Sequence, residues 1–183
     1  MVQVRGKGLA AGQLEQVTAG WVERLAGLPS LVVVDDCTDV ALAARADGVH
    51  LGADDLPLEV ARALAPSLLL GASTHDREEL LAAQAAGADY AGLGAFHATG
   101  TKPGTRLLDP GRAGLRDPVP GLAIAVLAIG GLDVSRVAEA MRVPAVTGIA
   151  VSAAVQEAGD PDGAIERLRE ALNEAWTARE EGR

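Results

Sequence analysis

The sequence has few aromatic residues, a single cysteine and no cluster of basic residues. Phe, Trp and Tyr make up 2% of its 183 residues, so its core must be built from aliphatic side chains. The lone Cys37 excludes an intramolecular disulfide and fits a reducing cytoplasm. A net charge of −9 without a basic block argues against nucleic acid as a partner. No apolar run reaches the ~18 residues that cross a bilayer, which argues against a membrane protein.

The sequence does contain a regular alternation of short apolar runs and amphipathic segments. The runs are β-branched or leucine-rich without strict alternation, which is typical of strands buried on both faces. The expected strands are 2–5, 31–34, 48–51, 68–72, 90–94, 124–130 and 146–151. The expected helices are 12–27, 38–46, 57–65, 76–87, 109–116, 134–142 and 163–178. This order predicts an α/β fold with a parallel sheet in one domain, 1–183.

Acidic residues follow the second and third expected strands, at the ends where parallel α/β proteins carry their chemistry. Neighbouring strands lie ~5 Å apart, so the carboxylates of Asp36 and Asp55 can reach one divalent cation. Oxygen ligands in small number suit Mg²⁺, which retains water and shares phosphate oxygens. The alternative is that both aspartates cap helices. Of Asp35 and Asp54, we expect one to point into the protein and the other to cap the helix beginning near Pro57.

Cations also follow the expected strands, although they come from distant parts of the sequence. Arg5, Lys7 and Lys102 together can neutralise a pyrophosphate; the alternative is solvated surface charge. Lys102 lies in a long loop with Thr99 and Thr101, which predicts a phosphate-gripping flap or, alternatively, an ordinary surface loop. Glycine and small residues at 128–131 and 150–154 end the last two strands and predict an anion site there.

The histidines are assigned mainly structural roles. His50 lies inside an apolar run and is expected to be a packed or hydrogen-bonded core residue. His75 is expected to help cap the helix that follows it. His97 lies in the long loop and could meet a substrate. No spacing of His and Cys indicates zinc, and no arrangement resembles a Ser-His-Asp triad.

Seven segments of the sequence together resemble the thiamine phosphate synthase and TenI family. They are "QVRGKGL", "DDCTDVALAARADGVHLGADDLP", "GASTH", "GADYAGLG", "TGTKPGT", "AIGGL" and "VSAA". The resemblance runs over nearly the whole chain. It implies a TIM-type (β/α) barrel of which seven units are visible and the first strand and helix are missing. It implies an enzyme that joins a pyrimidine pyrophosphate to a thiazole phosphate and releases pyrophosphate. An open barrel exposes strand edges, which association into a homo-oligomer would cover.

The resemblance also implies roles for individual residues. Gln3, Arg5 and Lys7 would hold the pyrimidine pyrophosphate, with Lys102 on the pyrophosphate and Ser73 near the pyrimidine. Asp36 and Asp55 would hold Mg²⁺. The thiazole phosphate would be bound by Thr99, Thr101, Gly131, Val151 and Ser152.

The sequence departs from the family pattern beside the metal position. Asp35 is also assigned to the substrate-binding residues. It stands where the family usually has Asn, and we expect this carboxylate to repel pyrophosphate unless it is protonated or metal-bound. Two other functions stay open: a TenI-like thiazole tautomerase with His97 as its base, and a truncated paralogue that binds phosphate ligands without catalysis. The retained Thr-x-Thr-Lys loop and metal carboxylates favour the synthase.

Overall fold

The computed structural model describes residues 1–100 and 106–182. Within them the chain forms two compact units. Unit 1 comprises Met1–Ser73 and Ala83–Tyr90, and unit 2 comprises Thr74–Ala82 and Ala91–Arg183. None of the helices in the described residues is both long enough and apolar enough to span a membrane.

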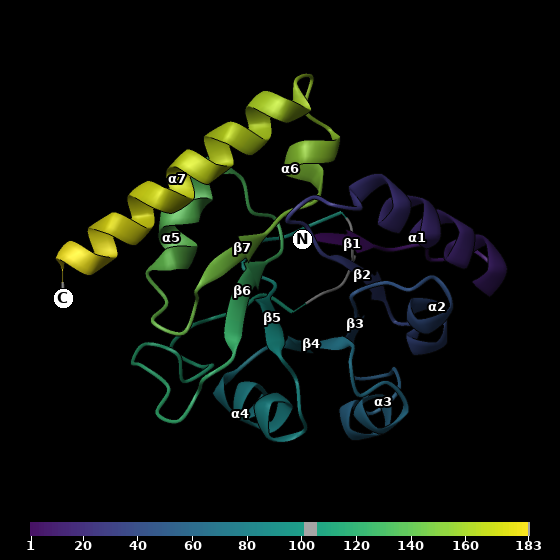
Figure 1. The fold of residues 1–183 in the computed structure, drawn as a ribbon. Helices are drawn as coiled ribbons and strands as arrows, with labels where there is room; N and C mark the ends of the chain where they lie inside the picture. Colours follow the sequence, from purple (N-terminus) through teal and green to yellow (C-terminus); the bar gives the residue numbers. More distant parts are fainter. Residues whose placement is uncertain (101–105, 183) are drawn as a thin grey trace. The chain divides into compact units, whose positions relative to one another are not determined.

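Unit 1 is a parallel sheet whose strands alternate with helices (Figure 1). Its elements in chain order are β1 (Val2–Val4), α1 (Ala11–Leu25), β2 (Val32–Asp35), α2 (Thr38–Ala43), β3 (Gly48–Leu51), α3 (Leu58–Leu64) and β4 (Leu69–Thr74). The strands lie in the order β1-β2-β3-β4, and each neighbouring pair is parallel. The sheet therefore carries the carboxyl ends of β1–β4 at one edge.

The register of unit 1 separates an apolar face from a polar face. Val4, Val34, Val49 and Leu70 are partners across the four strands, and all four are buried in one aliphatic core. One position further along, Asp35, His50 and Gly71 are partners across β2, β3 and β4. Because successive side chains of a strand point to opposite faces, this second row lies on the face away from the core.

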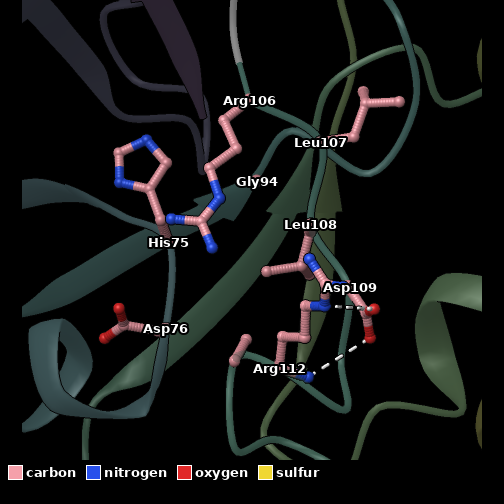
Figure 2. A pocket seen from close by; sticks show the side chains of 9 residues that line it. His75, Asp76, Gly94, Arg106, Leu107, Leu108, Asp109 and Arg112 are labelled. Carbon is pink, nitrogen blue, oxygen red and sulfur yellow. Dashed lines mark hydrogen bonds and ion pairs between the residues drawn. The ribbon is translucent and has the colours of Figure 1, made fainter.

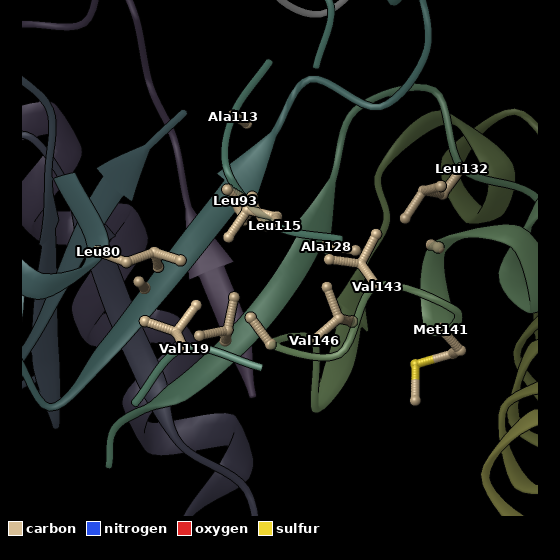
Figure 3. Packing of buried hydrophobic residues seen from close by; sticks show 14 of the residues in the cluster. Leu80, Leu93, Ala113, Leu115, Val119, Ala128, Leu132, Met141, Val143 and Val146 are labelled. Carbon is tan, nitrogen blue, oxygen red and sulfur yellow. The ribbon is translucent and has the colours of Figure 1, made fainter. Parts of the chain in front are cut away.

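Unit 2 contains the remaining strands and helices. Its elements are β5 (Tyr90–Gly94), β6 (Ala125–Ile129), η1 (Val134–Arg136), α5 (Val137–Met141), β7 (Gly148–Ala150), α6 (Ala153–Gln156) and α7 (Pro161–Glu181), and α4 (Arg77–Ala85) begins in it. Strands β6 and β7 pair in parallel. Leu80, Leu93, Leu115, Val126 and Val146 are fully buried in its aliphatic core (Figure 3).

All seven expected strands are present in the described residues, and two of them, β3 and β5, have the predicted bounds. The helix expected at 109–116 is wrong. The Asp109 carboxylate accepts the N–H groups of Gly111 and Arg112, and Gly114 has a φ of +69°. These contacts make a series of turns where a helix was expected, because the side chain competes for the backbone donors and glycine adopts the left-handed conformation.

Candidate functional site

At the carboxyl end of β1 and β2, three side chains predicted to bind substrate contact one another. Asp35 is buried; it accepts a hydrogen bond from Gln3 Nε2 at 2.7 Å and forms an ion pair with the Arg5 guanidinium. Arg5 therefore supplies the charge opposite to that of Asp35, and the expected repulsion of pyrophosphate by Asp35 stays a prediction. Asp35 also orients two of the side chains that were predicted to hold the pyrimidine pyrophosphate.

Asp36 and Asp55, the two predicted metal ligands, also lie in unit 1. Asp36 follows β2 with a φ of +68°, and its N–H donates to the His50 carbonyl at 2.9 Å. Burial, the charge of Asp55 and a hydrogen bond with the Asp55 side chain raise the pKa of Asp36, and the charges of Arg5 and Lys7 oppose this rise. The two carboxyl groups are therefore near enough for the charge of Asp55 to oppose the ionisation of Asp36.

The alternative interpretation of these aspartates as helix caps is wrong. The N-cap residues of α2 and α3 are Cys37 and Pro57, and neither helix start is capped by a side chain. Asp54 is exposed and also caps neither helix. The Asp55 carboxylate instead accepts the Gly52 N–H at 2.7 Å, which fixes it at the end of β3.

The donor set of Asp36 and Asp55 fits a hard cation that keeps part of its water shell. The described residues contain no group of three or more His, Cys, Asp or Glu side chains placed to hold a metal ion. Two carboxylates are few ligands for Zn²⁺ or Ca²⁺, but they suit Mg²⁺ when a substrate phosphate supplies further oxygens. Arg5 lies 3.9 Å from the Asp36 carboxylate, so a cationic side chain borders the same position.

Ser73, predicted to lie near the pyrimidine, is the second-last residue of β4 and lies beside two other polar side chains. His50 Nε2 lies 3.0 Å from Ser73 Oγ, and His50 Nδ1 lies 3.1 Å from the Tyr90 hydroxyl. His50 is buried, which confirms the expectation of a hydrogen-bonded core histidine. Tyr90 was not anticipated as part of the site, because its contact with His50 depends on the register of β3 and β4.

In unit 2 the segment after β5 runs along the end of β6. The His97 N–H donates to the Gly130 carbonyl at 3.0 Å, and a Cβ added to Gly131 would lie 2.9 Å from His97 Cβ. Gly131, with a φ of +58°, therefore provides the space for this segment. His97 Nε2 is buried without a hydrogen bond among the described residues and lies 3.6 Å from Glu139 Oε2.

Other residues predicted to bind the thiazole phosphate also lie in unit 2. Val151 and Ser152 follow β7, and Ser152 precedes α6, where its hydroxyl donates to Gln156 Oε1 at 3.3 Å. Thr99 follows the segment that contacts β6. Thr101 and Lys102 lie outside the described residues. The phosphate-binding role of this whole group stays a prediction.

A cavity in unit 2 includes residues that the sequence analysis did not assign to a substrate or metal site. Its lining residues are His75, Asp76, Gly94, Arg106, Leu107, Leu108, Asp109, Arg112 and Ala113, and Figure 2 labels all of these except Ala113. His75 does not cap α4: Asp76 Oδ1 accepts the Glu79 N–H at 2.9 Å, and the His75 imidazole contacts Glu79. Arg106 follows residues 99–102 in the sequence. Its positive charge beside that segment could be read from the sequence, but its position in the lining of this cavity could not.

Comparisons with known proteins agree with the motifs. The family model for thiamine monophosphate synthase matches residues 1–155. A thiamine-phosphate synthase of Pyrococcus abyssi is 46% identical over 79% of this chain and 69% of its own length. One of Chloroflexus aurantiacus is 42% identical over 92% of this chain and 77% of its own length.

Solved structures show the same likeness. The thiamine phosphate pyrophosphorylase of Pyrococcus furiosus has a TM-score of 0.83 and 38% identity, over 94% of this chain and 82% of that chain. A 3-hexulose-6-phosphate synthase, 20% identical with a TM-score of 0.67 over 93% of this chain and 86% of that chain, shares the fold alone. The fold is thus α/β of the TIM type. The chain belongs to the thiamine monophosphate synthase family of transferases.

Proposed function

We propose that this protein joins hydroxymethylpyrimidine pyrophosphate to thiazole phosphate, giving thiamine phosphate and pyrophosphate. The observation that carries the proposal is the grouping of Arg5, Lys7, Asp36 and Asp55 at the carboxyl ends of unit 1 strands. The electrostatic effect of Lys7 and Arg5 on Asp36 indicates that cations and carboxylates act on one position. Such a mixture suits an anionic leaving group bound together with a divalent cation.

Asp36 and Asp55 would hold Mg²⁺. When bound, the ion supplies positive charge that stabilises the departing pyrophosphate. Without it the two carboxylates repel each other, and burial together with this repulsion raises the pKa of Asp36. The side chain that follows, Cys37, is half-buried and has its pKa raised first by burial and then by Asp39, Asp36 and Asp55, so its thiol stays protonated.

The protein's own side chains bind and orient the two substrates. Arg5, Lys7 and Lys102 neutralise the pyrophosphate, while Gln3 and Ser73 orient the pyrimidine. Thr99, Thr101, Gly131, Val151 and Ser152 bind the thiazole phosphate. The bond between the pyrimidine methylene carbon and the pyrophosphate oxygen breaks, and the thiazole nitrogen forms a bond to that carbon. No proton moves at the reacting atoms, so charge stabilisation and positioning are the main contributions.

The proposal is tested by measuring thiamine phosphate formation from both substrates in the presence of Mg²⁺ or of a chelator. We expect turnover that chelation abolishes and that Mg²⁺ restores. Asp36→Asn and Asp55→Asn should each reduce turnover strongly, while the matched change Asp54→Asn, at an exposed neighbour, should leave it within about twofold. Substrate binding without turnover would instead support the paralogue that binds phosphate ligands.

A second candidate function, a metal-independent thiazole tautomerase, rests on His97 and Glu139. The buried Nε2 of His97 lies 3.6 Å from Glu139 Oε2, so a carboxylate could assist this imidazole as a base. Thiazole tautomer exchange that survives chelation and is lost in His97→Gln would favour this function. The same exchange in His97→Gln as in the unaltered protein would exclude His97 as the base.

Two further expectations stay predictions: a cytoplasmic location and association into a homo-oligomer.

A further inference from the structure

Tyr90, His50 and Ser73 form a chain of polar contacts within unit 1. The Tyr90 hydroxyl lies 3.1 Å from His50 Nδ1, and His50 Nε2 lies 3.0 Å from Ser73 Oγ. Tyr90 and His50 are 8% and 7% exposed, whereas Ser73 is half-buried. These polar contacts therefore lead from the interior, at Tyr90, to the last residues of β4, where the pyrimidine is proposed to bind.

Gly71 makes this chain of contacts sterically feasible. It is the partner of His50 in the β3–β4 register. A Cβ at Gly71 would overlap the Tyr90 ring carbon Cζ and hydroxyl oxygen, and it would lie 2.5 Å from His50 Nδ1. The Tyr90 side chain thus crosses over β4 through the space that a glycine leaves, and it reaches His50 on β3.

Donor and acceptor capacities determine where the protons lie. Burial raises the pKa of Tyr90, so its hydroxyl keeps its proton. Within the described residues, His50 Nδ1 is the acceptor within hydrogen-bond distance of that hydroxyl. A buried O–H group needs an acceptor, so Tyr90 donates to Nδ1. The neutral imidazole then carries its proton on Nε2 and donates it to Ser73 Oγ.

This order leaves the Ser73 hydroxyl with its own proton directed away from His50. We infer that Tyr90 and His50 are positioning residues that set Ser73 as a hydrogen-bond donor to a ring nitrogen of the aminopyrimidine. The inference rests on the proposed function and adds the direction of the hydrogen bond. If the imidazole carried its proton on Nδ1, Ser73 would donate to His50 and could only accept from substrate, for example from the amino group.

The same row of the sheet connects this chain to the charged part of the site. Asp35 is the register partner of His50, and it contacts Gln3 and Arg5. The polar face of unit 1 therefore runs from Arg5 through His50 to Ser73. A pyrimidine bound over this face would meet the Ser73 donor while its pyrophosphate reaches the cations.

The test is a double-mutant cycle on steady-state kinetics with Tyr90→Phe and Ser73→Ala. Tyr90→Phe removes the hydroxyl but keeps the ring, and we expect KM for the pyrimidine pyrophosphate to rise about tenfold, with kcat within about twofold. Ser73→Ala should raise the same KM by at least as much. The double variant should be no worse than Ser73→Ala, because Tyr90 acts only through Ser73.

Two controls separate this role from a loss of stability. Thr18→Val removes another fully buried hydroxyl in unit 1, one that donates to the Leu14 carbonyl at 2.7 Å. It should lower the melting temperature as Tyr90→Phe does but leave both KM values unchanged. A pyridine analogue with carbon in place of the accepting ring nitrogen should bind the unaltered protein and Tyr90→Phe equally well.

The outcomes are distinguishable. If the unaltered protein forms no thiamine phosphate, the proposed function fails. If it does, but Tyr90→Phe leaves KM unchanged or its effect adds fully to that of Ser73→Ala, the positioning role is overturned. The pyridine analogue tests the assigned proton direction. If the ratio of its affinity to that of the natural pyrimidine is the same in Tyr90→Phe as in the unaltered protein, the assigned direction is overturned.

Discussion

Unit 1 holds its candidate site residues through side-chain partners, whereas unit 2 presents mainly backbone and glycine at its strand ends. In unit 1, Asp35 links Gln3 with Arg5, and His50 links Tyr90 with Ser73. In unit 2, Gly131 gives space to the segment containing His97. Preorganised charges suit the stabilisation of a leaving group, and close backbone approach suits the binding of a phosphate. We therefore expect substitutions in the two units to affect different kinetic parameters.

The largest effect is expected from removing the Arg5 charge. Arg5→Met should lower kcat/KM about 10²–10³-fold, because an oriented cation at the leaving group is lost. It should also reduce the free energy of unfolding by about 2 kcal/mol, because Asp35 is left buried without its cation. Urea denaturation and initial rates measure the two effects.

The double variant Arg5→Met/Asp35→Asn is the control for this interpretation. It should recover part of the stability, since the unpaired charge is gone, but none of the activity. Recovery of activity would show that Arg5 serves only to neutralise Asp35.

Truncating a buried leucine should reduce the free energy of unfolding by a similar amount in the cores of the two units, although their candidate site residues differ. Leu70 in unit 1 and Leu93 in unit 2 are both fully buried in aliphatic clusters. Leu70→Ala and Leu93→Ala should each reduce the free energy of unfolding by about 3 kcal/mol, through lost burial and the cavity left behind. Urea midpoints test this, and a difference above about 2 kcal/mol would show that one core is packed less closely.

A smaller effect is expected on the pH dependence of the free energy of unfolding, to which Asp36 in unit 1 contributes. Its pKa in the folded protein is raised above the ordinary value of 3.8, so protonation favours the folded state. This contribution is complete below pH 3.8 and is lost as the pH rises through the raised pKa. In Asp55→Asn the loss should be smaller, because the neighbouring charge is removed.

Melting temperatures across this range in the presence of a chelator measure the difference between the two proteins. Added Mg²⁺ should raise the melting temperature of the unaltered protein at neutral pH but not that of Asp55→Asn. The same pH dependence in both proteins would contradict the pairing of Asp36 with Asp55.

The smallest effect is expected in unit 2 at Glu139. Its side chain is 63% exposed, so its interaction with His97 is screened by solvent. Under the synthase proposal, Glu139→Gln should change thiamine phosphate formation by less than about twofold. A loss of tenfold or more in the same rate would indicate that His97 and Glu139 act together in the chemistry.

The sequence predicted strands more reliably than it predicted the connections between them. The run at β3 is short and lies between Asp47 and Gly52, and the run at β5 follows Asp89 and ends on Gly94, so their bounds agree with the prediction. The segment at 109–116 was expected to be a helix, but Pro110, Gly111 and Gly114 favour turns. The four-residue helix α6 was missed because so short a segment has no periodicity to detect.

The candidate site was predictable where it depends on which residues follow each strand. Asp36 and Asp55 follow β2 and β3 in the sequence, and parallel strands bring such positions together. The partners of Asp35 and the path of Tyr90 over Gly71 were not predictable, because they depend on register and on which residue leaves an empty space. Long-range contacts of this kind are set by packing across the sheet and not by local pattern.

The most direct test of the proposed function is the rate of thiamine phosphate formation by the purified protein with both substrates, measured with Mg²⁺ and with a chelator. We expect release of one pyrophosphate for each thiamine phosphate, a dependence on Mg²⁺, and a loss of both products in Asp36→Asn. Product formation that is equal with the chelator, or that persists in Asp36→Asn, would contradict the proposed site.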